Sequence, residues 1–234
     1  MDYGVSELGS VELKTKRLRS KDWVEFQCVG CGECCRHLTE KVMVESLDAF
    51  RLARYLRDHG QPHMTVEEFY TRYTTPVPFA RGYPIFTMNT AGNEESCVFL
   101  KDGRCSVYPA RTRACRLYPF SVGPGERGQD FEWYQCLDAS HHFSGSKVQV
   151  KDWFYQHFSR EDREYVKREA DACRIIGAFL AKMDFPAYQR ALPIMILLRY
   201  HDFDLDQPFL PQYDHNLQVL LKHMERLLEE GGGQ

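Results

Sequence analysis

Phe26-Gln-Cys-Val-Gly-Cys-Gly-Glu-Cys-Cys-Arg-His37 is the stretch of this chain that says most about its fold. It places four cysteines within eight residues: Cys28, Cys31, Cys34 and Cys35. Four thiols this close cannot all pair in unstrained disulfides, because vicinal and i,i+3 bridges fit the required Cα separations badly. Thiolates at two-residue spacings suit a soft metal ion instead. We therefore interpret the stretch as metal-binding and expect the fold to be organised around the metal.

A second group of cysteines lies further along the chain: Cys97, Cys105, Cys115 and Cys136. Tetrahedral zinc and a [4Fe–4S] cluster each take four thiolates, so the eight cysteines could fill two sites. Alternatively, one site takes four of them and the other thiols are spare or carry chemistry. We predict all eight as candidate metal ligands. Cys173 stands apart, and we expect it to be a small buried residue.

The spacing within the first group favours iron–sulfur over zinc. Cys28-x-x-Cys31-x-x-Cys34 is the three-cysteine run found around cubane clusters, whose fourth ligand commonly comes from far along the chain. Zinc sites more often join two Cys-x-x-Cys pairs, and this chain has no second pair. Cys34 and Cys35 are adjacent, so their side chains start in different directions, and we expect only one of them to bind a given ion.

Arginines are frequent beside the cysteines: Arg36, Arg104, Arg111, Arg113 and Arg116. Four thiolates around a divalent ion, or around a [4Fe–4S]²⁺ cluster, leave a net charge near −2, which calls for nearby cations and N–H donors. The arginines could supply them. The alternative is that they are ordinary surface residues.

Composition limits the classes of function. The 234 residues include 43% hydrophobic ones, so a real core is available. A net charge of −3 gives no electrostatic argument for nucleic acid. The first residues lack the basic and apolar regions of a secretory signal, and the longest apolar run, residues 191–198, is too short to span a bilayer. We expect a cytoplasmic protein without membrane contact, whose thiols stay reduced and available for metal.

Helical signals flank a middle region of short strands. Ser46 is expected to cap a helix from Leu47 to His59, and Thr65-x-x-Glu68 resembles a capping box for a short helix that Pro76 and Pro78 end. Short strands are expected at 83–88, 95–100 and 131–136, with an Asp-Gly turn that closes a hairpin between Cys97 and Cys105.

The last third of the chain is predicted to be helical. Helices are expected over 160–183 after the cap Ser159, over 193–200 after a break at Pro186, and from the cap Asp214 to Leu228. The fold class is therefore α+β. We expect a small irregular cysteine-rich metal-binding domain with short strands at 1–145 and a helical C-terminal region at 146–234 packed on it.

Both cysteine motifs resemble those of the YkgJ-type cysteine-cluster proteins, the CxxCxxCC zinc- or iron-chelating domain family. The first motif is Cys28-Val-Gly-Cys-Gly-Glu-Cys-Cys-Arg36, and the second is Cys97-Val-Phe-Leu followed by Cys105-Ser-Val-Tyr-Pro-Ala-Arg-Thr-Arg-Ala-Cys115 and then Cys136. Thr112 departs from the pattern, since the family usually has proline after the arginine. The resemblance spans roughly residues 26–140 and implies metal chelation. A flagellin lysine methylase carries a similar cluster, so an enzyme role is possible by analogy.

Several other residues are candidates for roles beside the cysteines. His37, His141 and His142 could supply nitrogen ligands, although solvent-facing histidines are more common. Glu33 and Asp102 could act as bases in an enzyme, but a turn explains Asp102 fully. Aromatic residues around the second motif are expected to form a dry wall beside the metal: Tyr108, Tyr118, Phe120, Trp133 and Tyr134.

The leading hypothesis is a protein that holds an iron–sulfur cluster, [4Fe–4S] first, with a redox, cluster-handling or electron-transfer role and a protein redox partner. One alternative is a zinc-binding structural or interaction module. Another is a cluster-dependent group-transfer enzyme such as a protein methylase. In each case we expect the metal to supply much of the folding free energy of the cysteine region.

Overall fold

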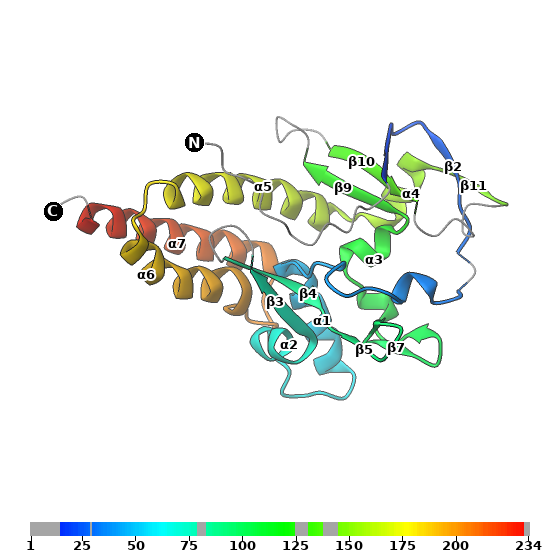
Figure 1. Ribbon diagram of the computed structural model, residues 1–234, viewed down its shortest axis with the longest axis horizontal. Coiled ribbons are helices and arrows are strands. Elements are labelled where there is room, and N and C mark those ends of the chain that lie inside the picture. The colour runs from blue at the N-terminus through cyan, green and yellow to red at the C-terminus, as the bar shows by residue number, and fades with distance from the viewer. Residues whose placement is uncertain (1–14, 29, 79–82, 125–130, 138–144, 232–234) are drawn as a thin grey trace.

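The computed structural model describes residues 15–28, 30–78, 83–124, 131–137 and 145–231. It has the α+β architecture that the sequence predicts, with several small antiparallel sheets and a helical C-terminal region (Figure 1). Within the described residues, no helix is both long and apolar enough to cross a membrane.

Helix α1 (Ser46–Asp58) follows the first cysteine motif. Ser46 is not its cap, contrary to the sequence prediction: the capping position is Glu45, and Ser46 is the first helical residue. The Ser46 hydroxyl is buried and hydrogen-bonds the Tyr165 hydroxyl at 3.0 Å. Because the Ser46 hydroxyl is bonded to Tyr165 of a later helix, it does not accept a hydrogen bond from the first backbone amides of α1.

Helix α2 (Val66–Tyr73) begins as predicted, because the Thr65 hydroxyl accepts a hydrogen bond from the Glu68 amide at 3.0 Å. The helix ends before the two prolines, which lie in the following strand β3 (Thr74–Pro78). Strand β3 pairs antiparallel with β4 (Pro84–Met88) in a two-stranded sheet, where proline is tolerated at a free edge.

The second cysteine motif is carried by four very short strands. These are β5 (Thr90–Ala91), β6 (Ser96–Cys97), β7 (Leu100–Lys101) and β8 (Arg104–Cys105). The strand expected over 95–100 is thus divided between β6 and β7. The predicted Asp-Gly turn is confirmed: Asp102 and Gly103 have φ values of 49° and 72°, and Leu100 pairs with Cys105. A 3₁₀ turn, η3 (Tyr108–Ala110), and the short helix α3 (Arg113–Leu117) follow.

A second group of strands packs beside helix α4 (Val150–His157). It comprises a sheet ordered β1 (Thr15–Leu18), β10 (Phe131–Cys136), β9 (Phe120–Pro124) and the pair β2 (Trp23–Glu25), β11 (Lys147–Gln149). The predicted strand at 131–136 is confirmed as β10. Leu117, Phe120 and Phe154 are buried at the centre of this group.

The C-terminal region is helical, as predicted, with shifted boundaries. Its elements are α5 (Arg160–Leu180), α6 (Phe185–Ile196), the π-helical turn η5 (Leu197–His201) and α7 (Phe209–Gly231). Ser159 forms the expected capping box at the start of α5. Pro186 lies in the first turn of α6, where it needs no N–H partner, rather than between helices.

Two sequence predictions in this region are wrong. Pro193 lies inside α6 and does not begin a helix. Asp214 lies inside α7 and does not cap it; its carboxylate is ion-paired with Arg168 of α5. An aspartate in a helix interior is indistinguishable in sequence from a cap when its partner is on another helix.

The larger core joins the C-terminal helices to α1 and α2. Among its fully buried side chains are Leu52, Phe69, Met195, Leu220 and Met224. Figure 1 shows the hairpins labelled β5 and β7 at the opposite end of the molecule from the last turns of α7. The division into regions 1–145 and 146–234 stays a prediction.

Candidate metal centre

Two glycines let the first cysteine loop turn tightly. Gly30 and Gly32 have φ values of 67° and 72°, in the left-handed region that favours glycine. After Gly32 the chain forms the 3₁₀ turn η1 (Glu33–Cys35). A Cβ atom on Gly32 would lie 3.1 Å from the Gly103 carbonyl oxygen, so the loop rests directly on the β7–β8 hairpin.

Backbone hydrogen bonds hold the rest of this loop to the β5–β6 hairpin. The His37 amide donates to the Glu94 carbonyl oxygen at 2.8 Å, and the Leu38 amide donates to the Glu95 carbonyl oxygen at 3.1 Å. The Arg36 guanidinium forms an ion pair with the Glu94 carboxylate. These contacts join two cysteine motifs that lie about 60 residues apart in sequence.

Five thiols gather where the motifs meet. Cys34 and Cys35 come from η1, Cys97 from β6, Cys105 from β8 and Cys115 from α3. The thiols of Cys97 and Cys115 lie close enough to that of Cys35 to raise its pKa electrostatically. Cys34 acts in the same way on Cys97, Cys105 and Cys115.

Backbone N–H groups donate to two of these sulfurs. The Phe99 amide donates to Cys97, and the Val107 amide donates to Cys105, so each sulfur accepts from the amide two residues further on. Each of these hydrogen bonds favours the thiolate form. Such donors are typical of thiolates that hold metal, because they offset negative charge on sulfur.

Most thiols of the group are protonated at neutral pH in the metal-free protein. Burial raises the pKa of Cys115 to about 12, and burial also raises the pKa values of Cys97 and Cys105. Cys34 differs, because a hydrogen bond with the Cys35 thiol and the charge of Arg111 lower its pKa to about 7. Metal binding here would therefore release protons.

Cys34 and Cys35 have thiols within hydrogen-bonding reach of each other. Their side chains start from adjacent residues of the η1 turn, and the two sulfurs nevertheless come within reach of each other. Which of the two binds metal stays a prediction.

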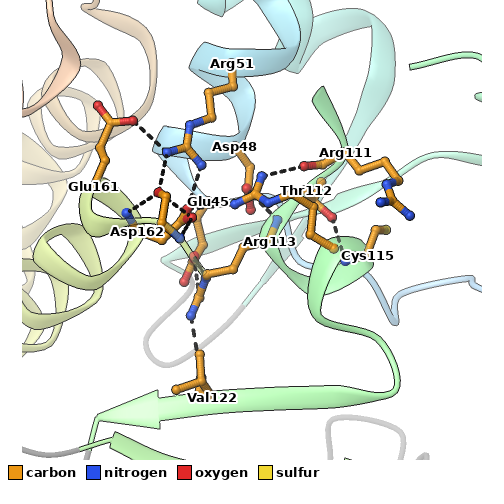
Figure 2. A network of polar contacts seen from close by, with 12 residues as sticks. Glu45, Asp48, Arg51, Arg111, Thr112, Arg113, Cys115, Val122, Glu161 and Asp162 are labelled. Carbon is orange, nitrogen blue, oxygen red and sulfur yellow. Dashed lines mark hydrogen bonds and ion pairs between the residues drawn. The ribbon is translucent and has the colours of Figure 1, made fainter. Parts of the chain in front are cut away.

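The arginines near the cysteines divide into two sets. Arg111 favours the thiolate forms of Cys34 and Cys105 through its charge, and its guanidinium lies 3.5 Å from the centroid of the Tyr108 ring. Arg113 and Arg116 instead reach carboxylates of α1 and α5. In Figure 2, Arg111 and Cys115 lie at one end of the polar network, away from Asp162.

Sequence reasoning missed the acidic partners of this network: Glu45, Asp48, Glu161 and Asp162. Asp48 and Asp162 are 3% and 1% exposed. A buried carboxylate without a basic partner is rare, so an aspartate at a core position of α1 was a signal available in the sequence. Its partner could not be inferred, because Arg113 comes 65 residues later.

Other candidate ligands lie outside the five-thiol group or outside the described residues. Cys28 and Cys31 are exposed, and Cys136 ends β10, where its amide donates to the Pro119 carbonyl oxygen at 2.7 Å. His141 and His142 fall outside the described residues. As the described side chains stand, no group of three or more His, Cys, Asp or Glu residues converges to hold a metal ion.

The donor set still fits a soft metal by its chemistry. Four thiols each lie within electrostatic range of Cys34, two of them accept amide hydrogen bonds, and the charge of Arg111 acts on Cys34 and Cys105. To bind an ion, these side chains would have to turn toward a common point. The assignment of all eight cysteines as ligands stays a prediction.

Cys173 is exposed, not buried as the sequence predicts. Its sulfur lies 3.4 Å from the Glu169 carboxylate and 3.8 Å from the Arg199 guanidinium. It occupies helix α5, away from the five-thiol group.

The predicted aromatic wall is only partly beside the thiols. Tyr108 contacts Arg111, but Phe120 and Trp133 pack on Phe154 in the second core, with ring centroids 6.0 Å and 4.1 Å away. Tyr134 donates a hydrogen bond to Glu132 at 2.6 Å.

Comparison with known proteins agrees with this chemistry. The model of the CxxCxxCC family, described as "Putative zinc- or iron-chelating domain", matches residues 27–174, which is more than half of the chain. The chain belongs to this family. The matched region of the CxxCxxCC domain includes every cysteine of both motifs and most of α5.

One curated relative is an uncharacterized protein of Methanocaldococcus jannaschii. It is 33% identical over 101 residues, which cover 42% of this chain and 47% of that protein. The chain thus spans about half the length of the relative. No solved structure matches.

Proposed function

We propose that this CxxCxxCC protein holds an iron–sulfur cluster through its cysteine thiolates and uses it in electron transfer, redox sensing or cluster handling. The observation that carries the proposal is the meeting of five thiols from η1, β6, β8 and α3. The family description, which names zinc or iron, supports metal chelation by these cysteines.

Iron–sulfur is favoured over zinc by the spacing of the first motif. Cys28-x-x-Cys31-x-x-Cys34 is the run that ligates cubane clusters, with a remote fourth cysteine. Cys115 is a suitable remote ligand, since it is tied to the same thiol group. We infer [4Fe–4S] as the cluster type on this ground.

The exposure of Cys34 supports a redox role. A cluster bound at this thiol would lie near the protein surface, where a redox partner could approach it. Solvent exposure and N–H donors to sulfur also tune the potential of such a cluster. We infer a protein redox partner and a cytoplasmic setting in which the thiols stay reduced.

A structural zinc site is the second candidate, and the two short hairpins favour it. Cys97 and Cys105 lie in two-residue strands that bury little apolar area. A tetrahedral ion held by these two, Cys115 and one thiol of η1 would crosslink three segments that have weak intrinsic stability.

Anaerobic purification with iron, zinc and acid-labile sulfide quantitation tests the proposal. A cluster protein contains iron and sulfide in equal amounts and absorbs near 400 nm. Colourless protein that contains only zinc would refute the cluster proposal and support the structural zinc site. Protein that binds neither metal, even after reconstitution, would refute both.

Cysteine variants test the ligand assignment. Cys28→Ser, Cys31→Ser and Cys115→Ser are each expected to lose bound metal and soluble yield, because each removes a thiolate ligand. Cys173→Ser is the matched control and should change neither. Bleaching by Cys173→Ser together with full metal content in Cys31→Ser would show that the assignment is wrong.

A further inference from the structure

The short helix that carries Cys115 is anchored by a buried ion network. Asp162, near the start of α5, accepts hydrogen bonds from Arg51 of α1 at 2.6 Å and from Arg116 of α3 at 2.7 Å. Its other oxygen accepts from Ser159 in the capping box of α5, at 2.7 Å from the hydroxyl. Figure 2 shows the Arg51 side chain pointing toward Glu161 and Asp162.

Arg113 anchors the other end of α3. Its backbone amide donates to the buried Asp48 carboxylate at 2.7 Å, and its guanidinium donates to Glu45 at 2.5 Å. The two arginines therefore flank Cys115 and both bind carboxylates on other helices.

Helix α3 needs such anchors. It has only five residues, and isolated helices of this length are not stable in water. Thr112 caps it by accepting from the Cys115 amide at 3.3 Å, which leaves the direction of the helix to the two arginines. The position of the Cys115 sulfur thus depends on the carboxylates of α1 and α5.

We propose that Arg113, Arg116 and Asp162 are positioning residues for the metal ligand Cys115, so that metal occupancy and the docking of α3 onto the start of α5 are thermodynamically coupled. This inference rests on the proposed function, because it takes Cys115 as a ligand. Metal bound to Cys115 would hold α3 in its docked position, and the docked α3 would maintain the ion pair between Arg116 and Asp162.

The burial of Asp162 makes the coupling strong. Burial alone would raise the pKa of Asp162, but Arg51 and Arg116 hold it below the usual value, so the carboxylate is ionised. Removing that charge leaves two arginines partly buried without their shared partner, which is far costlier than losing a surface ion pair. Linkage requires the effect to be reciprocal: if metal binding stabilises the docked α3, then undocking α3 weakens metal binding by the same factor.

The test uses the full chain, purified metal-free under reducing conditions, with Zn²⁺ as the probe and a competing chelator to measure its affinity. Asp162→Asn should bind Zn²⁺ at least tenfold more weakly than wild type. Glu169→Gln is the control: it removes another carboxylate of α5, which pairs with Arg199 and accepts from Tyr213 at 2.6 Å instead of binding Arg113 or Arg116. This control should keep affinity within twofold of wild type even if its unfolding free energy falls.

Hydrogen exchange of wild type gives a second measurement that needs no variant. Zn²⁺ loading should slow amide exchange over residues 160–166 at the start of α5, whereas the end of α7 should exchange at an unchanged rate. If Asp162→Asn does not fold, Arg116→Gln replaces it in the affinity measurement.

Three results would overturn the inference. These are equal Zn²⁺ affinity of wild type and Asp162→Asn, equal weakening by Asp162→Asn and Glu169→Gln, or unchanged exchange over 160–166 on loading. If the wild-type protein binds Zn²⁺ but one of these three results is obtained, only the inference fails and the proposed function is unaffected. Wild-type protein that takes up no Zn²⁺ and no iron refutes both together.

Discussion

Gly32 is one of the points at which the two cysteine motifs touch. Its left-handed backbone turns the first motif, and its missing side chain lets the loop approach the carbonyl oxygen of Gly103. Gly30 has nearly the same φ, but a Cβ there would meet nothing within 4 Å. A side chain at Gly30 would therefore cost only backbone strain at positive φ, whereas one at Gly32 would cost the same strain and also press on Gly103.

Substitution of these glycines tests the contact. Gly30→Ala and Gly32→Ala should each lose about 1–2 kcal/mol of stability, because both place a side chain at positive φ. Gly32→Ala should lose more and should also bind metal more weakly, since its Cβ would push on the hairpin that carries Cys105. Thermal unfolding and a Zn²⁺ titration of both variants measure this, and equal metal affinity in the two would contradict it.

Three arginines within six residues have opposite orientations. Arg111 faces the thiols, whereas Arg113 and Arg116 face the carboxylates of α1 and α5. The sequence pattern predicts cations near the cysteines, and for Arg111 this is what the structure has. The sequence pattern cannot predict which of the three arginines faces the thiols, because the direction of each side chain depends on how α3 packs.

Two of the four predicted helix caps are confirmed, together with the predicted hairpin turn. Thr65 and Ser159 cap α2 and α5 through hydrogen bonds to amides three residues on, and the Asp102-Gly103 turn closes the β7–β8 hairpin. These features depend on neighbouring residues only. Ser46 and Asp214 have the same residue types at plausible positions, but their side chains bind Tyr165 and Arg168 on another helix.

The cap of α2 can be tested directly. Thr65→Ala should lower the unfolding free energy by about 1 kcal/mol, because the Glu68 amide loses its acceptor. Thr71→Ala is the control: the exposed Thr71 hydroxyl only bonds the Glu67 carbonyl one turn back, and alanine favours the helix. Urea unfolding measures both, and a loss from Thr71→Ala as large as that from Thr65→Ala would argue against the cap.

Across the whole molecule, two cores support the candidate metal centre from different sides. The larger joins α1 and α2 to α5, α6 and α7, and the smaller lies between α4 and the β1-β10-β9 sheet. Helix α3 lies between them: Leu117 belongs to the smaller core, while Cys115 packs against the larger. The ligand region is therefore placed by the packing of the whole chain.

His157, at the end of α4, makes stability depend on pH. Burial and the charges of Arg111 and Arg116 lower its pKa below the usual 6.5. At this residue the unfolded chain then binds more protons than the folded protein between that lowered pKa and 6.5, so the contribution of His157 to stability falls as the pH drops from about 7 through this range. Solvent screens a half-buried imidazole, so the loss is small.

His157→Gln should therefore remove the part of the pH dependence that lowers stability between pH 7 and 5, while Glu45, whose pKa burial raises to about 7, keeps its opposite contribution in both proteins. Urea unfolding of both proteins at several pH values measures the slopes. His201, whose pKa burial also lowers, keeps part of the slope in the variant. Identical slopes in wild type and His157→Gln would contradict the assignment.

Residue types and local spacing were enough to predict the metal chemistry, the α+β class, the hairpin turn and two of the caps. Each of these depends on atoms within a few residues of one another, where sequence distance and spatial distance nearly coincide. Tertiary packing determined which thiols of the two motifs meet, and it alone determined that Arg113 and Arg116 bind Glu45, Asp48 and Asp162. These contacts join segments 46 to 68 residues apart, and such pairings depend on the orientation of whole helices, which no local pattern encodes.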